Sequence, residues 1–128
     1  MSLCKKVLVV EDEEDIRTTL LEILDSEGYK ATGAQDGAEA LEVLKQEKEP
    51  TLVLLDLMMP RMSGWELLDH REALAPHKVV TMSVFESTAS LQDPTPLDVD
   101  YKLVKPVTLD QVLGAARRFC GVPAAVVG

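Results

Sequence analysis

The sequence predicts an α/β protein whose parallel sheet carries helices on both faces. Two observations lead to this fold class. Five short apolar segments with strand character alternate with segments that have helical spacing or capping patterns. The third of them, residues 51–55, carries no charge and is followed by Asp56 and Pro60, as expected for a strand buried on both faces. A chain of 128 residues suits one domain with a real hydrophobic core.

The first predicted strand, residues 5–10, leads into an acidic run at residues 11–15. A helix should follow, because the next apolar residues have the spacing of one helical face. Those residues are Ile16, Leu20, Ile23 and Leu24. Gly28 fits just past the C-terminus of this helix. Residues 29–34 alternate larger polar with smaller residues, which predicts a half-solvated edge strand.

Two more helices are expected, one before and one after the central strand (residues 51–56) in the sequence. Asp36, with Glu39 three residues later, predicts the N-cap of the second helix. Its inner face should contain Ala38, Leu41 and Leu44. Residues 63–66 have the pattern of a capping box and should open a third helix, which Pro76 ends. The apolar positions of that helix are Leu67, Leu68 and Leu74.

The last part of the chain holds two further strands and the least regular segment. Residues 78–83 predict the fourth strand. Residues 84–92 could form a short fourth helix, but the prolines within residues 93–96 stop any continuation. Residues 101–104 predict a fifth strand, and residues 108–111 a capping box that opens the last helix. The residues expected to be buried on that helix are Leu109, Val112, Leu113, Ala116 and Phe119.

Composition and charge limit the kinds of partner. We expect residues 1–120 to form one domain and residues 121–128 a tail or linker. The formal net charge of −9 argues against binding to nucleic acid or to an anionic membrane. No apolar run approaches the ~20 residues of a membrane span, and residues 1–3 lead straight into a strand without a signal peptide. Cys4 and Cys120 are expected to be free thiols of a reducing cytoplasm, with a disulfide between them as the less favoured alternative.

Five chemically useful residues should share one edge of the sheet, because each follows or ends a predicted strand. They are Glu11, Asp12, Asp56, Ser83 and Lys105. In open α/β sheets, ligands bind at the carboxyl ends of the strands. Three neighbouring carboxylates repel unless a cation neutralises them, and oxygen ligands without His or Cys favour Mg²⁺ or Mn²⁺. A carboxylate beside such a cation and a lysine suits phosphoryl transfer onto the carboxylate. The alternative is that each residue is an ordinary polar loop residue.

These residues and their neighbours resemble the receiver domain of bacterial two-component response regulators. The resemblance covers residues 5–120 and rests on four segments: Val9-Val10-Glu11-Asp12-Glu13, Leu55-Asp56-Leu57-Met58-Met59-Pro60 with Ser63-Gly64, Ser83, and Lys105-Pro106. It implies a flavodoxin-like three-layer sandwich with strands in the order 2-1-3-4-5. It also implies a cytoplasmic protein that accepts a phosphoryl group on Asp56 from a sensor histidine kinase or phosphotransfer protein. Such a protein catalyses only its own phosphorylation and dephosphorylation.

The resemblance further assigns a role to each residue. Asp12 and Asp56 would ligate Mg²⁺ directly, Glu11 through water, and Met58 through its backbone carbonyl. Ser83 would donate a hydrogen bond to the phosphoryl group, and Lys105 would contact it. Thr81 lies on the same face as Ser83 by strand parity, but only Ser83 lies at the strand's end. The bond before Pro106 is expected to be cis. The protein is expected to be a monomer or weak dimer, with its downstream partner unspecified.

Three departures from the family pattern bear on signalling. Val84 is bulkier than the small residue usual after the hydroxyl residue, so we expect slower phosphorylation, slower hydrolysis or both. Lys102 occupies the position of the family's switch aromatic, with Tyr101 one residue earlier and facing the other way. Pro94 and Pro96 interrupt the fourth helix. These departures motivate an alternative function, an interaction module that acts without phosphorylation.

A phosphatase with an aspartyl nucleophile is a third hypothesis. Such enzymes place a second Asp two residues after the first, and Met58 occupies that position here. His70 and His77 belong to no kinase-type motif and are expected to be surface residues. Trp65 is expected to serve packing.

Overall fold

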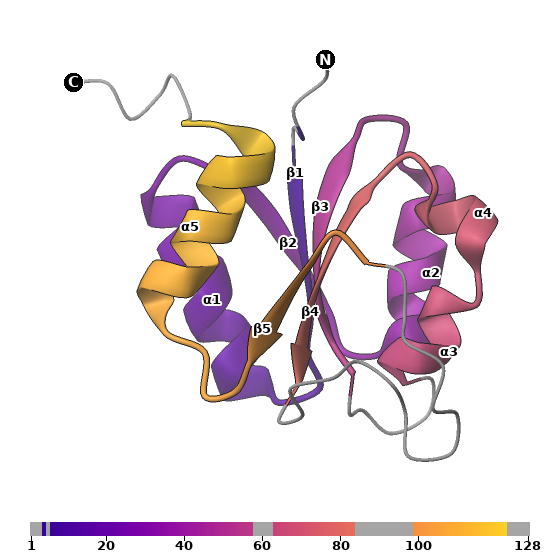
Figure 1. The fold of residues 1–128 in the computed structure, drawn as a ribbon, viewed down its shortest axis with the longest axis horizontal. Helices are drawn as coiled ribbons and strands as arrows, with labels where there is room; N and C mark the ends of the chain where they lie inside the picture. Colours follow the sequence, from indigo (N-terminus) through magenta and orange to yellow (C-terminus); the bar gives the residue numbers. More distant parts are fainter. Residues whose placement is uncertain (1–3, 5, 58–62, 84–98, 123–128) are drawn as a thin grey trace.

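The computed structural model describes residues 4, 6–57, 63–83 and 99–122. Five parallel strands form one sheet in the order β2-β1-β3-β4-β5 (Figure 1), which confirms the predicted flavodoxin-like arrangement. The strands are β1 (Lys6–Val10), β2 (Lys30–Ala34), β3 (Thr51–Asp56), β4 (Lys78–Ser83) and β5 (Tyr101–Val104). The helices in the described residues are α1 (Glu14–Ser26), α2 (Gly37–Gln46), α3 (Gly64–Leu68), α4 (Arg71–Leu74) and α5 (Leu109–Cys120).

The helices cover both faces of the sheet, with α1 and α5 on one side and α2, α3 and α4 on the other (Figure 1). The central strand β3 contributes to both cores, because successive side chains of a strand point to opposite faces. Leu52 and Leu54 pack in the cluster under α1 and α5, whereas Val53 and Leu55 pack in the cluster under α2 and α3. All four are fully buried, which explains the uncharged apolar run in the sequence.

The strand register brings the carboxyl ends of the strands to one edge. Val10, the last residue of β1, pairs with Leu55, and Asp56 pairs with Met82. Ser83 ends β4 opposite Val104, which ends β5. Residues that directly follow these strands therefore gather at this edge, as the sequence predicted.

The predicted N-terminal caps are confirmed. The side chain of Asp36 accepts a hydrogen bond from the backbone N–H of Glu39 at 2.9 Å. Ser63 with Glu66, and Thr108 with Gln111, form complete capping boxes. Such caps satisfy backbone N–H groups that a helix leaves unpaired at its start.

Two apolar residues expected on the buried helix faces are exposed instead. Ile16 is 41% exposed in the first turn of α1, and Leu109 is 49% exposed at the first position of α5. Helical spacing predicts which face of a helix is apolar, but it does not report which of its turns the rest of the protein covers. Later residues of both helices pack as predicted, including Leu20, Leu24 and Val112. On α2, Ala38 is only half-buried, and Ala40 is the fully buried residue of that turn.

The third predicted helix is two short helices, α3 and α4, separated at Asp69 and His70. The backbone N–H groups of both residues donate to the carbonyls three residues back, at 3.2 and 2.9 Å. This tighter winding turns the chain, yet the predicted apolar residues of both helices stay in one cluster. Those residues are Leu67, Leu68 and Leu74. The predicted short helix at residues 84–92 lies outside the described residues.

His77 is buried, which contradicts its expected surface position, whereas His70 is exposed as expected. The ring nitrogen Nδ1 of His77 accepts a hydrogen bond from the backbone N–H of Thr51 at 3.0 Å. The imidazole thus satisfies the first amide of β3, and burial lowers the pKa of His77 below its usual value. No helix among the described residues is long and apolar enough to span a membrane.

Candidate functional site

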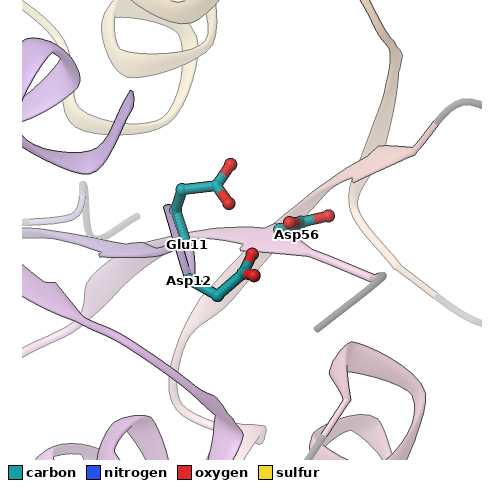
Figure 2. Close-up of side chains that lie close together, drawn as sticks. All are labelled: Glu11, Asp12 and Asp56. Carbon is teal, nitrogen blue, oxygen red and sulfur yellow. The ribbon is translucent and has the colours of Figure 1, made fainter. Parts of the chain in front are cut away.

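Three carboxylates converge where β1 and β3 end. Glu11 and Asp12 directly follow β1, and Asp56 is the last residue of β3. Each offers an oxygen atom, and these atoms lie within 4.8 Å of one another (Figure 2). Glu11 and Asp56 are almost completely buried, whereas Asp12 is more accessible to solvent. The three residues therefore form an acidic site that opens to solvent on the Asp12 side.

Lys105 supplies the positive charge of this site from the far side of β4. Its ammonium nitrogen lies 3.2 Å from Oδ1 of Asp56 and 3.7 Å from Oε1 of Glu11. The backbone N–H of Lys105 donates to the carbonyl of Ser83 at 2.7 Å, so the residue after β5 is attached to the end of β4. The Lys105–Pro106 peptide bond is cis, as expected from the family resemblance.

The electrostatics of the site favour an added cation. Burial raises the pKa of Glu11 to about 8, helped by its hydrogen bond with Asp12 and by the negative charge of Asp56. Burial opposes the charge on Lys105, but the nearby carboxylates of Asp56 and Glu11 outweigh this and raise the pKa of Lys105. One lysine therefore does not remove the electrostatic cost of ionising Glu11 in this buried site.

Contacts from α1 and β2 hold the Glu11 segment in place. The Arg17 guanidinium donates to the Glu11 carbonyl at 2.8 Å, and the Glu11 N–H donates to Ala34 at 3.0 Å. A Cβ atom on Gly33 would lie 2.9 Å from Cδ of Arg17, so a bare backbone there gives the arginine room. The sequence argument missed Arg17, whose one signal is a lone cation just after an acidic run.

The hydroxyl residues of β4 occupy different levels of the sheet. Ser83 is buried at the end of the strand, next to the residues that precede Lys105. Thr81 pairs with Leu55, one residue before Asp56, and its buried hydroxyl has no hydrogen-bond partner within the part of the chain that the structure describes. The register thus places Ser83, and not Thr81, at the edge with the carboxylates. The Met58 position, predicted as a backbone ligand, lies outside the described residues.

Gly64 packs against the backbone that carries Asp56. A Cβ atom at this position would lie 2.7 Å from the carbonyl oxygen of Asp56 and 2.7 Å from Cα of Leu57. The N–H of Gly64 also donates to the carbonyl of Leu57 at 3.2 Å. The start of α3 therefore lies directly on the end of β3, and this requires glycine.

A cavity of about 510 Å³ adjoins the acidic site. Its lining includes Glu11, Ile16, Lys105 and Pro106, so α1 and the segment after β5 form its walls. Ile16 lines this cavity, which accounts for its partial exposure. The cavity also gives a molecule at the surface a route toward Glu11 and Lys105.

The chain has Lys102 at the position where the family pattern has its switch aromatic. Lys102 is exposed on β5. Tyr101 is 44% exposed, and the guanidinium carbon of Arg118 lies 5.0 Å from the centre of its ring. This distance is suited to a cation–π contact between β5 and α5.

Comparison with known proteins identifies the chain's relatives. The model of the response regulator receiver domain matches residues 7–117. Sporulation initiation phosphotransferase F of Bacillus subtilis is 30% identical over 116 residues, which cover 90% of this chain and 93% of that protein. Response regulator MprA of Mycolicibacterium vanbaalenii is 35% identical over 117 residues, covering 88% of this chain but only 48% of that protein.

Solved structures agree with this assignment. Chemotaxis protein CheY4 of Vibrio cholerae superposes with a TM-score of 0.76 at 25% identity, over 91% of this chain and 98% of that one. Response regulator protein TrrA of Thermotoga maritima, in complex with Mg(2+)-BeF, gives a TM-score of 0.74 at 30% identity, over 90% of this chain and 98% of that one.

Proposed function

The chain belongs to the response regulator receiver domain family, and from this we propose that Asp56 is its phosphoryl acceptor. The observation that carries the proposal is the meeting of three carboxylates and one ammonium group at the carboxyl edge of the sheet. The donor would be a phosphohistidine of a sensor histidine kinase or phosphotransfer protein. An oxygen of Asp56 would attack phosphorus, the bond from phosphorus to the histidine nitrogen would break, and an acyl phosphate would form.

The donor set suits Mg²⁺ or Mn²⁺. Carboxylate oxygens are the ligands that these hard cations prefer, and three of them lie within 4.8 Å of one another. Burial, the hydrogen bond with Asp12 and the charge of Asp56 raise the pKa of Glu11, so a bound cation would favour its ionised form. Asp12 and Asp56 would hold the ion directly and Glu11 through water, and the carbonyl of Met58 stays a predicted ligand. When bound, the ion would offset negative charge on the phosphoryl oxygens.

The two remaining residues would bind the transferred group. Lys105 already lies 3.2 Å from the carboxylate that would attack, so its ammonium group would also lie beside the incoming phosphoryl oxygens. Ser83 would donate its hydroxyl hydrogen to another of them. The register that places Ser83 at the edge supports this role over the same role for Thr81.

The experiment is phosphorylation by a small donor. The protein is incubated with acetyl phosphate and Mg²⁺, and intact mass spectrometry measures the gain of one phosphoryl group. We expect labelling of the wild type and of Asp25→Asn, an exposed control on α1, but not of Asp56→Asn. Addition of a chelator should also prevent labelling. Labelling that persists in Asp56→Asn would contradict the assignment of Asp56.

A second candidate function is a protein-interaction module that acts without phosphorylation. The contact of Arg118 with Tyr101, together with Lys102 at the switch position, favours it, because no aromatic side chain stands where the family's switch residue is expected. Under this function, wild type and Asp56→Asn would bind a partner equally well, with or without acetyl phosphate. We further propose a cytoplasmic location, a monomeric or weakly dimeric state and a protein partner that receives the signal. Several relatives are about twice as long as the region that matches this chain.

A further inference from the structure

Cys4 and Cys120 meet at the edge of the sheet opposite the acidic site. Cys4 precedes β1, whereas Cys120 is the last residue of α5. The start of β1 and the end of α5 lie at the same end of the molecule, near the top of Figure 1. The backbone N–H of Cys4 donates to the carbonyl of Phe119 at 2.9 Å, so the two backbones are in direct contact beside Cys120.

The two side chains also meet. Cys4 is 4% exposed and belongs to the core cluster under α1 and α5, and the half-buried Cys120 packs against that cluster. The neighbouring Cys120 thiol lowers the pKa of Cys4, although burial of Cys4 opposes this effect. A thiolate at Cys4 would therefore be stabilised by the S–H group of Cys120. Both cysteines are free thiols in the structure, and their separation in the chain gave no sign that they are neighbours.

We propose that Cys4 and Cys120 are an oxidisable pair that forms an intramolecular disulfide when the protein meets hydrogen peroxide. Peroxide is the oxidant class that the geometry suits, because Cys4 is almost covered and a small molecule is needed to reach it. A bridge requires backbones within about 7 Å and side chains directed at each other. The backbone hydrogen bond between Cys4 and Phe119 supports the first condition, and the packing of Cys120 against the core cluster that contains Cys4 supports the second.

The two thiols and hydrogen peroxide are the only reactants that the disulfide requires. The Cys4 thiolate attacks one peroxide oxygen, so that an S–O bond forms, the O–O bond breaks and hydroxide leaves as water after taking up a proton. The Cys120 sulfur then attacks the oxidised sulfur of Cys4. An S–S bond forms, the S–O bond breaks, and the Cys120 proton leaves with hydroxide as a second water. The two thiols lose two electrons in total, and the peroxide gains them.

The bridge would constrain the fold without touching the acidic site. It would tie the start of β1 to the end of α5 and close a loop that spans nearly the whole domain. Long loops gain most from such a constraint, because the cross-link restricts the unfolded chain. Tyr29 already fastens the same region, since its hydroxyl donates to the carbonyl of Gly121 at 2.8 Å.

The test uses the reduced 128-residue chain, treated with hydrogen peroxide in metal-free buffer. We expect intact mass to fall by two hydrogens, reactive thiols to fall from two to none, and the product to remain a monomer. The melting temperature should rise by at least ~5 °C, and a reducing agent should reverse all three changes. The same treatment in strong urea should give at least ~10-fold slower bridging, because unfolding separates the two cysteines.

The matched control is Cys120→Ser, which keeps the buried Cys4. It should show no loss of two hydrogens and no rise in melting temperature after peroxide. The proposal is overturned if the wild type forms only disulfides between molecules, or if the two thiols are oxidised separately to sulfinic acids. It is also overturned if the bridged protein melts at or below the temperature of the reduced protein.

Discussion

The ammonium nitrogen of Lys105 lies 3.2 Å from Oδ1 of Asp56, although β4 lies between β3, which ends at Asp56, and β5, which Lys105 directly follows. The same nitrogen lies 3.7 Å from Glu11, so one cation serves two carboxylates. Lys105 would therefore have to satisfy the carboxylates in the resting protein and a phosphoryl group in the modified one. A divalent cation would compete with Lys105 for the carboxylates in the resting protein. In the modified protein, both cations would contact the phosphoryl group.

Replacement of Lys105 by Met distinguishes its interaction with the carboxylates from its interaction with the phosphoryl group. We expect phosphorylation of Lys105→Met by acetyl phosphate to be about 10²-fold slower, because a positive charge beside the transferred group is lost. Magnesium should bind at least as tightly as to the wild type, since the carboxylates lose a competing cation. Calorimetric titration and a mass-based rate assay measure both quantities. Lys45→Met, an exposed change on α2, should alter neither, and weaker magnesium binding by Lys105→Met would contradict this account.

Glu11 is expected to lower the stability of the metal-free protein at alkaline pH. Its pKa is raised from 4.5 to about 8 in the folded state, so the folded protein binds a proton there more tightly than the unfolded chain does. The stability associated with Glu11 is therefore complete below pH 4.5 and is lost as the pH rises toward 8. Without metal at pH 8, Glu11→Gln should unfold with a free energy about 1–3 kcal/mol higher than that of the wild type.

Urea unfolding at pH 5 and pH 8, with and without Mg²⁺, measures this effect. The advantage of Glu11→Gln should shrink at pH 5, and added Mg²⁺ should stabilise the wild type more than the variant. Glu42→Gln, an exposed change on α2, serves as the control and should follow the wild type at both pH values. If Glu11→Gln were less stable than the wild type at pH 8 without metal, the ionised Glu11 carboxylate would not destabilise the folded protein.

Much of the fold and site follows from short-range patterns in the sequence. The apolar run ending at Asp56 specified a strand buried on both faces, and parallel topology then placed the strand ends together. For this reason the positions of Glu11, Asp56, Ser83 and Lys105 could be anticipated, although their distances could not. Capping patterns also succeeded, because a cap involves residues only three apart.

The predictions that were wrong or missing share a cause. Each depends on contacts with residues that are distant in the sequence. Ile16 and Leu109 have helical spacing but are exposed in the first turns of their helices, and Ile16 lines a cavity. His77 looked like a loop residue, yet the unpaired N–H of Thr51 gives it a buried partner. The contact between Cys4 and Cys120 depends on how α5 returns to the start of β1, and no local pattern reports this.

Gly64 is expected to be essential for the geometry at Asp56. The added Cβ of Gly64→Ala would meet backbone atoms of Asp56 and Leu57 at 2.7 Å, and backbone cannot move aside as a side chain can. We expect a loss of about 1–3 kcal/mol in unfolding free energy and slower phosphorylation. Gly114→Ala is the matched control, because a Cβ on that exposed helical glycine has no atom within 4 Å. The free energy of unfolding of Gly114→Ala should be about 0.5–1 kcal/mol higher than that of the wild type. Equal stability of the two variants would contradict the close approach of α3 to β3.

His77 should make the fold less stable in mild acid. Burial lowers the pKa of His77 below its ordinary value of 6.5, so the unfolded chain takes up a proton that the folded protein resists. The neutral ring also accepts the hydrogen bond from Thr51, and protonation at Nδ1 would remove that acceptor. The stability associated with His77 is therefore complete above pH 6.5 and is lost as the pH falls below it, by at most about 1.4 kcal/mol per pH unit.

The measurement is urea unfolding between pH 5 and pH 8 for the wild type, His77→Gln and His70→Gln. His77→Gln should be less stable at pH 8, because a buried amide replaces the imidazole that packs there. Between pH 7 and pH 5.5 it should lose less stability than the wild type, by at most about 1.4 kcal/mol per pH unit. His70 is exposed, so His70→Gln should keep the wild-type pH dependence. If His77→Gln kept that dependence as well, the acid sensitivity would have to come from the carboxylates, and the buried imidazole would have no part in it.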